Sequence, residues 1–502
     1  MADTKREIER KYESDDSGLP DLTGVAGVAA VIDKGVAHLD ATYYDTRDER
    51  LAAASITLRR RVGGADAGWH LKFPVAPGVR DEIQAPLSDT VPRALAGLIR
   101  SRVRDAELLP VVRLLSERDV RHLVDAEGVL LAEASVDGVR AERLTEGGGT
   151  VQWTEIEIEL ADDGDPVFLD KVEKRLRKAG VRPSKSASKL ARALAETGGK
   201  KKRKKKAVEA ADPETAGDHV LAYLRAQRDA IVELDPAVRR DMYDSVHRMR
   251  VATRRMRSAF RSYGKVLDRA VTDPIGEELK WLAGELGVDR DQEVLTERLT
   301  ARLDELPRTL LAGPVRTRLR TWSHARSGGS RRRLIAVLDG KRYLELLAAL
   351  DALVAEPPVL KAAGGSPSKV LAKAVRKDFG KLTDLVEQAL ELPPGADRDL
   401  AIHEARKKCK RTRYSAEAAA KALGEPAVDL VRSMKSLQGL LGDHQDSVMT
   451  RLALRDLAGQ AHAAGESTFT YGVLYGHEER RAELVELDLP VTWPTIKGDL
   501  AV

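Results

Sequence analysis

The hydrophobic period of this sequence changes once along the chain, and the change falls at a run of basic residues. Up to about residue 197, apolar residues recur mostly at every second position, and glycine or proline pairs separate the runs. After residue 213, they recur with helical spacing. Lys200–Lys206 lie between the two parts, and seven consecutive like charges keep a segment extended. We therefore predict a domain at 1–197, a basic linker at 198–212 and a second domain at 213–495.

The two periods predict two kinds of structure. Alternation such as that of 151–160 is typical of antiparallel strands, and 169–179 is the clearest helix among them. In the second part, the clearest helical segments are 220–234, 239–267 and 400–423. The fold class expected is therefore α+β: a closed antiparallel β-barrel with a few helices, followed by an all-α helical bundle.

Composition excludes several classes of protein. A chain of 502 residues with 42% hydrophobic residues, and 84 basic against 79 acidic side chains, is typical of a folded protein. The single cysteine, Cys409, excludes an intramolecular disulfide framework and a cysteine-rich zinc site. No apolar run reaches the ~18 residues of a membrane span. The first residues do not resemble a signal peptide, so we expect a cytoplasmic protein without a membrane partner.

Charged residues alternate with apolar ones on several predicted strands. Residues two apart in a strand share a face. Three charged faces result: Glu7, Glu9 and Lys11; Arg59 and Arg61; and Glu155, Glu157 and Glu159. Like charges repel across neighbouring strands, so such carboxylates need a divalent cation and such basic groups need an anion. A closed barrel with a wet, charged interior satisfies both needs.

This combination of groups predicts a narrow chemistry. Mg²⁺ and Mn²⁺ prefer carboxylate oxygens and bridge them to substrate phosphates. Phosphoryl transfer requires positioning of the phosphates and neutralisation of their charge, which metals, Arg and Lys supply. We therefore expect a substrate with several phosphates, with Mg²⁺ or Mn²⁺ as the cofactor.

An ordered series of motifs in residues 1–197 resembles the CYTH family, the triphosphate tunnel metalloenzymes. The series opens with Glu7-Ile-Glu9-Arg-Lys11, a match to the family's Glu-x-Glu-x-Lys signature. It continues with Tyr44-Asp45-Thr46, Leu58-Arg59-Arg60-Arg61, Leu71-Lys72, Arg80-Asp81-Glu82, Arg118, Ser135-Val136-Asp137, Glu155-Ile156-Glu157-Ile158-Glu159 and Ser188-Lys189. The resemblance implies a tunnel that binds and cleaves a triphosphate.

The resemblance also assigns roles to residues. The expected catalytic residues are Glu7, Glu9 and Lys11. The expected metal ligands are Glu7, Glu9, Glu82, Asp137, Glu155, Glu157 and Glu159. The expected triphosphate-binding residues are Arg59, Arg61, Lys72, Arg80, Arg118 and Lys189, with Lys11 beside them. Three points stay open: whether Arg121 shares the role of Arg118, which of the three glutamates of 155–159 bind metal, and whether Lys189 is only a helix-terminus charge.

The helical part contains an internal repeat. His247–Arg257 and His403–Arg413 both carry His or a basic residue at offsets 0, 3, 7, 8 and 10. A Leu-Gly pair follows each copy, at Gly287 and Gly442, with an aspartate four residues later. Because the copies agree over more than one element, we predict two pseudo-symmetric helical halves.

Each copy places a stripe of cations along one helix face, because offsets 0, 3, 7 and 10 share a face. The pattern is similar to the CHAD domain, a helical module associated with inorganic polyphosphate. The polyphosphate-binding residues that this resemblance implies are His247, Arg250, Arg254, Arg255, Arg257, His403, Arg406, Lys407, Lys410 and Arg413. Nucleic acid is a competing polyanion. An aromatic content of 4% argues against the stacking platform that single strands need.

The leading hypothesis is a metal-dependent triphosphatase that hydrolyses inorganic triphosphate or a nucleoside triphosphate, with a helical domain that binds polyphosphate. Two alternatives remain open: an adenylate cyclase of the class IV type, and a non-catalytic polyphosphate-binding scaffold.

Overall fold

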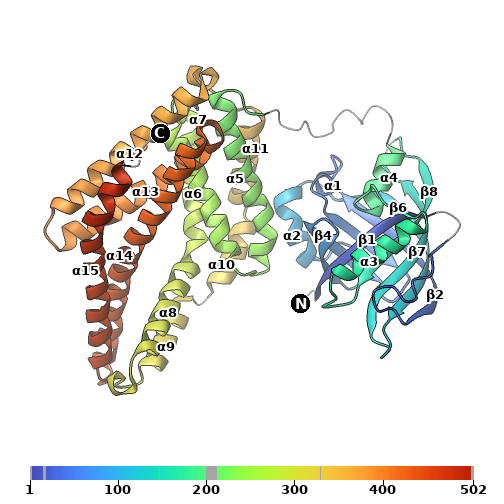
Figure 1. The fold of residues 1–502 in the computed structure, drawn as a ribbon, viewed down its shortest axis with the longest axis horizontal. Coiled ribbons are helices and arrows are strands. Elements are labelled where there is room, and N and C mark those ends of the chain that lie inside the picture. The colour runs from blue at the N-terminus through green and yellow to red at the C-terminus, as the bar shows by residue number, and fades with distance from the viewer. Residues whose placement is uncertain (1–2, 15–17, 146, 199–211, 328, 499–502) are drawn as a thin grey trace. The chain divides into compact units, whose positions relative to one another are not determined.

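The computed structural model describes residues 3–14, 18–145, 147–198, 212–327 and 329–498. The chain forms two compact units, residues 1–209 and 210–502. The predicted basic linker lies almost entirely outside the described residues. Each unit is described by itself below (Figure 1).

The first unit is a closed antiparallel barrel. Its strands are β1 (Asp3–Ser14), β2 (Ala30–Asp45), β3 (Thr57–Val62), β4 (Gly68–Ala76), β5 (Val79–Ala85), β6 (Leu109–Val124), β7 (Leu130–Arg143), β8 (Thr150–Leu160) and β9 (Arg182–Pro183). They pair in the order β5-β4-β3-β2-β6-β7-β8-β1-β9, and the pairing of β5 with β1 closes eight of them into a ring. The predicted barrel is confirmed.

Helices cover the apolar outer face of this barrel. They are α1 (Arg50–Ala53), α2 (Arg93–Val103) and α3 (Val167–Lys178). Phe168 and Val172 of α3 pack on Ile156 and Ile158 of β8, and α2 covers the strands on another part of the wall. Because the alternate apolar residues face outward onto helices, the charged residues between them face inward. The helix predicted at 169–179 is confirmed as α3.

One end of the barrel interior is filled by a fourth helix, α4 (Lys189–Thr197). Its Leu190 and Ala193 pack against Ala141 and Trp153, among other strand residues. Trp153 lies two positions before Glu155 on β8, so it belongs to the inward face. The interior is therefore divided into an apolar end, closed by α4, and a charged end.

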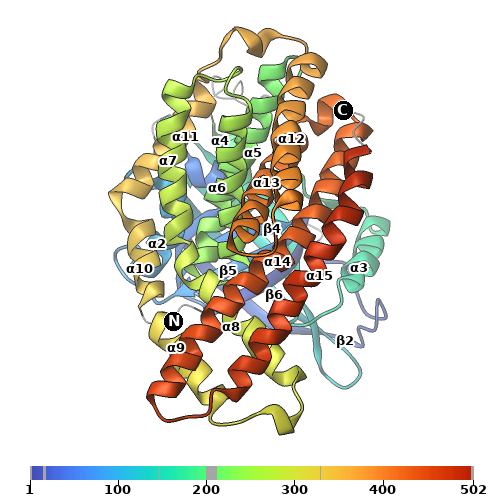
Figure 2. The ribbon, with the colours of Figure 1, turned by 90° about the vertical axis from the view of Figure 1, so that its left-hand side faces the viewer.

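The second unit is all-helical within the described residues. Its helices are α5 (Ala216–Arg239), α6 (Ser245–Ser262), α7 (Arg269–Glu285), α8 (Gly287–Glu305), α9 (Val315–Ser327), α10 (Ser330–Asp339), α11 (Lys341–Ala355), α12 (Pro367–Glu391), α13 (Ala396–Leu423), α14 (Glu425–Ala463) and α15 (Phe469–Gly498), with 3₁₀ turns η2 (Arg308–Leu310) and η3 (Lys361–Gly364). One apolar core unites α5, α6, α7, α11, α12 and α13. The hairpins α8–α9 and α14–α15 extend from it and share a second core (Figures 1 and 2).

The repeated halves are visible in the helices that carry the basic stripes. α6 contains the first stripe and α13 the second, and the two helices pack against each other. The prediction of one helix over 239–267 is wrong at both ends, because α5 ends at Arg239 and α6 spans Ser245–Ser262. Asp241 and Asp244 have φ angles of 60° and 59°, a left-handed conformation that a helix interior does not tolerate. No helix among the described residues is long and apolar enough to cross a bilayer.

A buried hydrogen bond ties the two stripe helices together and provides a test of the fold. The Tyr263 hydroxyl, at the end of α6, donates to the Ser415 carbonyl oxygen of α13 at 2.5 Å, and Tyr263 is almost fully buried. We expect Tyr263→Phe to lower the free energy of unfolding of the helical unit by about 1–2 kcal/mol, because it removes one buried hydrogen bond. Chemical denaturation followed by circular dichroism measures this. Tyr243→Phe is the matched control, since Tyr243 is 94% exposed and its change should have no effect.

Candidate functional site

The charged end of the barrel contains a cavity of about 380 Å³, called the barrel tunnel here. Eight Lys or Arg side chains and eight carboxylates line it, so the two signs balance. Twelve of the predicted site residues are among them: Glu7, Glu9, Lys11, Arg59, Arg61, Lys72, Arg80, Glu82, Arg118, Glu157, Glu159 and Lys189. Asp137 and Glu155 do not line the cavity but contact Lys189 at its floor.

Glu7 belongs to a network on one side of the tunnel. The Lys72 ammonium donates to Glu7 at 2.6 Å and lies 3.5 Å from Glu82. Nδ1 of His70 contacts Glu82 at 2.7 Å, and Arg59 lies 3.9 Å from the same carboxylate. Glu82 therefore has three basic neighbours, whereas Glu7 is paired with Lys72.

This difference separates the pKa values of the two carboxyl groups. Burial raises the pKa of Glu7 to about 7, because the attraction of Lys72 is too weak to offset it and Glu82 and Glu159 add repulsion. Burial also opposes the charged form of Glu82, but the hydrogen bond with His70 and the Lys72 ammonium hold the pKa of Glu82 well below its usual range. An additional cation near Glu7 would therefore be electrostatically favourable.

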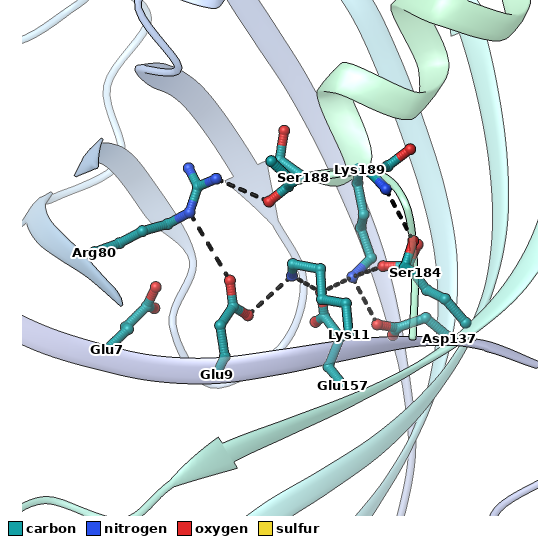
Figure 3. A network of polar contacts seen from close by, with 12 residues as sticks. Glu7, Glu9, Lys11, Arg80, Asp137, Glu157, Ser184, Ser188 and Lys189 are labelled. Carbon is teal, nitrogen blue, oxygen red and sulfur yellow. Dashed lines mark hydrogen bonds and ion pairs between the residues drawn. The ribbon is translucent and has the colours of Figure 1, made fainter. Parts of the chain in front are cut away.

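A second network surrounds Lys189 at the start of α4 (Figure 3). Its ammonium lies 2.9 Å from Asp137, 2.8 Å from Glu155 and 2.6 Å from Glu157. Arg118 donates two hydrogen bonds to Asp137, at 2.7 and 2.8 Å, and one to Glu157 at 2.6 Å. A cation is unfavourable at a helix N-terminus. The three carboxylates compensate for this, so Lys189 is both a helix-terminus residue and part of the tunnel.

Mutual compensation fixes the charge states in this second network. Burial alone would raise the pKa of Asp137 and of Glu157, but neighbouring cations outweigh burial and hold both pKa values below the usual range. Lys189 is the largest attractive influence on Asp137, whereas Lys11 is the largest on Glu157. Conversely, burial opposes the charged form of Lys189, yet the surrounding carboxylates raise its pKa. All these groups are therefore ionised at neutral pH.

The donor atoms of the tunnel fit a hard divalent cation. Carboxylate oxygens of Asp137, Glu155 and Glu157 lie within 4.8 Å of one another, a spacing that can hold a metal ion, although Lys189 neutralises them here. The raised pKa of Glu7 indicates that the neighbouring cations do not fully balance the negative charge of the carboxylates around it. Oxygen-only ligands of this kind suit Mg²⁺ or Mn²⁺ better than softer metals.

The structure shows where the residues of the open points lie relative to the cavity. Arg118 points into the tunnel, whereas Arg121 pairs with Asp119 at 2.9 Å and does not line the cavity. On β8, Glu157 and Glu159 line the cavity, while Glu155 lies beneath Lys189 and accepts a hydrogen bond from Trp153.

Sequence reasoning missed several side chains that line or support the tunnel. Lys5 lines it two positions before Glu7, and His70 supports Glu82 two positions before Lys72. Lys5 lies on the face that alternation had marked with Glu7, and His70 shares a face with Lys72, which the family resemblance had singled out. Tyr43 also lines the cavity, and its hydroxyl accepts a hydrogen bond from Arg59 at 3.4 Å. No charge pattern signals Tyr43.

The helical unit contains a larger cavity, of about 1020 Å³, called the basic cavity here. The stripes of α6 and α13 face it together, and α7, α8 and α14 complete its walls. Eleven Lys or Arg side chains and three carboxylates line it. Eight predicted residues are among them: His247, Arg250, Arg254, Arg257, His403, Arg406, Lys407 and Lys410. Arg255 and Arg413 do not line it, and both pair with Glu417, at 2.9 and 3.3 Å.

The two repeats use the same contact between an arginine and a glycine. A Cβ atom on Gly287 would lie 2.8 Å from the Arg250 guanidinium, and one on Gly442 would lie 3.4 Å from that of Arg406. Gly287, the first residue of α8, thus lets Arg250 lie against the helix backbone, whereas the approach of Arg406 to Gly442 of α14 is an ordinary van der Waals contact. The paired aspartates differ, because Asp291 accepts from Arg250 at 2.8 Å while Asp446 lies 3.7 Å from Arg298.

The cations of the basic cavity are incompletely neutralised. Burial, together with Arg406 and Arg254, lowers the pKa of Lys410 to about 7. Burial and neighbouring cations also lower the pKa values of Arg254 and Arg257. The Nε atom of Arg406 is buried without a hydrogen-bond partner among the described residues. A site of this kind is stabilised by an added anion.

Comparison with known proteins identifies both units. Residues 5–194 match the CYTH domain family and residues 222–455 match the CHAD domain family. A relative from Mycobacterium tuberculosis strain H37Rv, uncharacterized protein Rv2226, is 38% identical over 493 residues, which cover 95% of this chain and 93% of that protein.

Solved structures resemble parts of the chain. PptA from Streptomyces chartreusis has 20% identity and a TM-score of 0.46, over 56% of this chain and 100% of that one. HpAC1 from Hippeastrum, described as having a dominant triphosphatase activity, has 18% identity and a TM-score of 0.24, over 39% of this chain and 97% of that one.

Removal of the Lys189 ammonium tests the charge compensation. We expect Lys189→Met to lower the free energy of unfolding of the barrel by about 3–5 kcal/mol at neutral pH, because it removes a cation shared by three buried carboxylates, of which Asp137 and Glu157 keep only their other partners. Lys5→Met is the control, since Lys5 is 44% exposed and pairs with Glu159 near the surface, where a loss of ~1 kcal/mol at most is expected. Denaturant titrations of the three proteins measure both values.

The same variant predicts a pH dependence. In the wild type, the lowered pKa values of Asp137 and Glu157 contribute stability that is present at neutral pH and is lost as the pH falls through those values. Without Lys189, the carboxyl groups take up protons at higher pH. The deficit of Lys189→Met should therefore shrink as the pH falls from 7 to about 4. A deficit that is constant over this range would contradict the assignment.

Proposed function

The chain belongs to the CYTH family through its barrel and to the CHAD family through its helical unit, and on this basis we propose that the barrel tunnel is a metal-dependent triphosphatase site. Its substrate is inorganic triphosphate or the triphosphate of a nucleotide. The helical unit binds inorganic polyphosphate in the basic cavity.

The observation that supports the tunnel proposal most strongly is its charge balance. Eight basic and eight acidic side chains line one small cavity. Basic groups such as Lys72 and Lys189 form ion pairs with carboxylates there. A triphosphate can replace those carboxylates as the partner of Lys and Arg. The carboxylates that are released need cations in turn, so an anionic substrate and divalent metal ions enter the tunnel together without a large change in net charge.

Each side chain takes a role that follows from its place in these pairs. The proposed phosphate ligands are Lys11, Arg59, Arg61, Lys72, Arg80, Arg118 and Lys189. The proposed metal ligands are Glu7, Glu9, Glu157 and Glu159, with Glu82, Asp137 and Glu155 near them. A bound Mg²⁺ or Mn²⁺ ion would neutralise phosphate oxygens and acidify a bound water. The side chains hold the phosphate chain in line for attack and, because α4 closes the other end, limit entry to the charged end.

The basic cavity has the opposite charge balance, which supports a different mode of binding. Its eleven basic groups exceed its carboxylates by eight, so an anion binds there without a metal ion. The residues that line it include no Phe, Tyr or Trp, hence no surface on which bases could stack. These features favour a polyphosphate chain over single-stranded nucleic acid.

Phosphate release from tripolyphosphate with Mg²⁺ or Mn²⁺ tests the tunnel. We expect the double substitution Glu7→Gln and Glu9→Gln to reduce the rate by at least roughly 100-fold, because it removes two carboxylates that face the substrate. Glu117→Gln is the matched control, since Glu117 lies on β6 next to Arg118 but is exposed on the outer face. An unchanged rate in the double variant would rule out this site.

The same assay separates the alternatives. ATP is supplied in parallel and both cyclic AMP and phosphate are measured. Cyclic AMP as the main product would favour the cyclase, and binding of tripolyphosphate without turnover would favour the scaffold.

Binding of long-chain polyphosphate tests the basic cavity. We expect Arg254→Gln with Arg406→Gln to weaken binding about tenfold or more and to reduce the slope of affinity against salt concentration by roughly two. Arg255→Gln is the matched control, because Arg255 neighbours Arg254 but pairs with Glu417 outside the cavity. Calorimetric titration with and without Mg²⁺ measures both effects. Equal losses in the control and in the double variant would contradict the assignment.

A further inference from the structure

Lys410 differs from the other lysines of the basic cavity in its surroundings. It lies on α13 and lines the cavity, so it is accessible to a molecule that enters. The charged groups that act on it most strongly are Arg406 and Arg413 on its own helix, Arg254 on α6 and Asp446 on α14. Asp446 is 3.7 Å from Arg298, so it is shared with another cation.

A neighbouring lysine of the same helix provides the contrast. Lys407 also lines the cavity, but it pairs with Glu404 at 2.5 Å and is 56% exposed. Within the part of the chain that the structure describes, no ion pair involves Lys410. One amine is therefore stabilised as a cation, and the other is surrounded by cations.

These surroundings favour the neutral amine of Lys410. Burial and the adjacent guanidinium groups lower its pKa to about 7, so far more of this amine is unprotonated at neutral pH than in an ordinary lysine. An ordinary lysine, with a pKa near 10.4, has fewer than roughly one amine in a thousand in that form at pH 7. A lysine next to other cations is a known way to obtain a reactive amine in a protein.

The arginines that surround this amine also form a binding site for a phosphate group. Arg254 and Arg406 lie beside Lys410 and face the same cavity, and guanidinium groups bind phosphate oxygens through paired hydrogen bonds. A small molecule held by its phosphate would thus present the rest of its structure near a nucleophile.

We propose that Lys410 is a site of acylation by acyl phosphates, which the surrounding arginines bind through the phosphate group. The unprotonated Nζ attacks the carbonyl carbon and forms an amide bond. The bond from that carbon to the bridging oxygen breaks, and phosphate leaves with the electron pair. The proton lost from nitrogen passes to the phosphate or to water, so the step needs no further reactant.

Acylation would regulate the anion site. A bound anion favours the protonated, positively charged form of the amine, whereas the amide stays neutral. The modified cavity therefore has one positive charge fewer with which to bind a polyanion. A polyphosphate chain that is already bound would protect Lys410, because it occupies the cavity and favours the protonated amine. The inference rests on the proposed anion binding by the basic cavity.

The test incubates the full chain with acetyl phosphate at pH 7 and follows acetylation of each lysine by peptide mass spectrometry. We expect Lys410 to react at least about tenfold faster than Lys407, which is the internal control. Polyphosphate should slow the reaction at Lys410 and leave Lys407 unchanged. The rate at Lys410 should rise with pH and level off above about 7.

Two further measurements separate binding of phosphate from reactivity alone. Arg254→Gln with Arg406→Gln should remove the preference for Lys410. Acetylation by p-nitrophenyl acetate, which has no phosphate, should show a smaller preference than acetylation by acetyl phosphate. Equal preference with both reagents, or equal rates at Lys410 and Lys407, would overturn the proposal. Polyphosphate affinity is measured on the same preparation, so tight binding without acetylation would reject this inference and leave the proposed function standing.

Discussion

Compensation of buried charge is the interaction on which the first unit depends. A carboxylate or an ammonium group that leaves water loses several kcal/mol of solvation, which only a close opposite charge can offset. Lys189 meets this need for three carboxylates at once, and α4 supplies it. Because α4 also closes the apolar end of the barrel through Leu190 and Ala193, the same short helix completes the core and neutralises the tunnel floor.

The two cavities of the chain differ in the balance of basic and acidic side chains that line them. In the barrel tunnel the signs are equal in number, so the buried charges neutralise one another, and the proposed phosphate chain would replace carboxylates as the partner of Lys and Arg. In the basic cavity cations outnumber carboxylates. Burial and repulsion between these cations lower the pKa of Lys410, which reduces the excess of positive charge. Under the proposed function, the first arrangement suits metal ions together with a substrate, and the second suits a polyanion alone.

The repeat in the helical unit has a physical basis in packing. Arg250 lies against Gly287 at the start of α8, Arg406 lies near Gly442 of α14, and both stripes face one cavity. The two copies have diverged where packing allows it, since Asp291 pairs with the arginine of its own repeat and Asp446 does not. Two similar halves thus form one site that neither half could form by itself.

The sequence by itself determined the barrel, the helical unit and most of the inward-facing charges. A strand has a period of two and a helix one of 3.6. Alternation therefore placed Glu7 with Glu9 on one strand and Arg59 with Arg61 on another, and the stripe offsets placed Arg406 with Lys410 on one helix face. Periodicity does not tell which of two neighbouring basic residues faces a cavity, and only the tertiary structure decided this. Arg118 rather than Arg121 faces the tunnel, and Arg255 turns to Glu417, because strand pairing and helix packing select among neighbouring faces. The ion pairs of Lys189 could not be predicted from periodicity either, because contacts between α4 and distant strands bring its ammonium to the carboxylates.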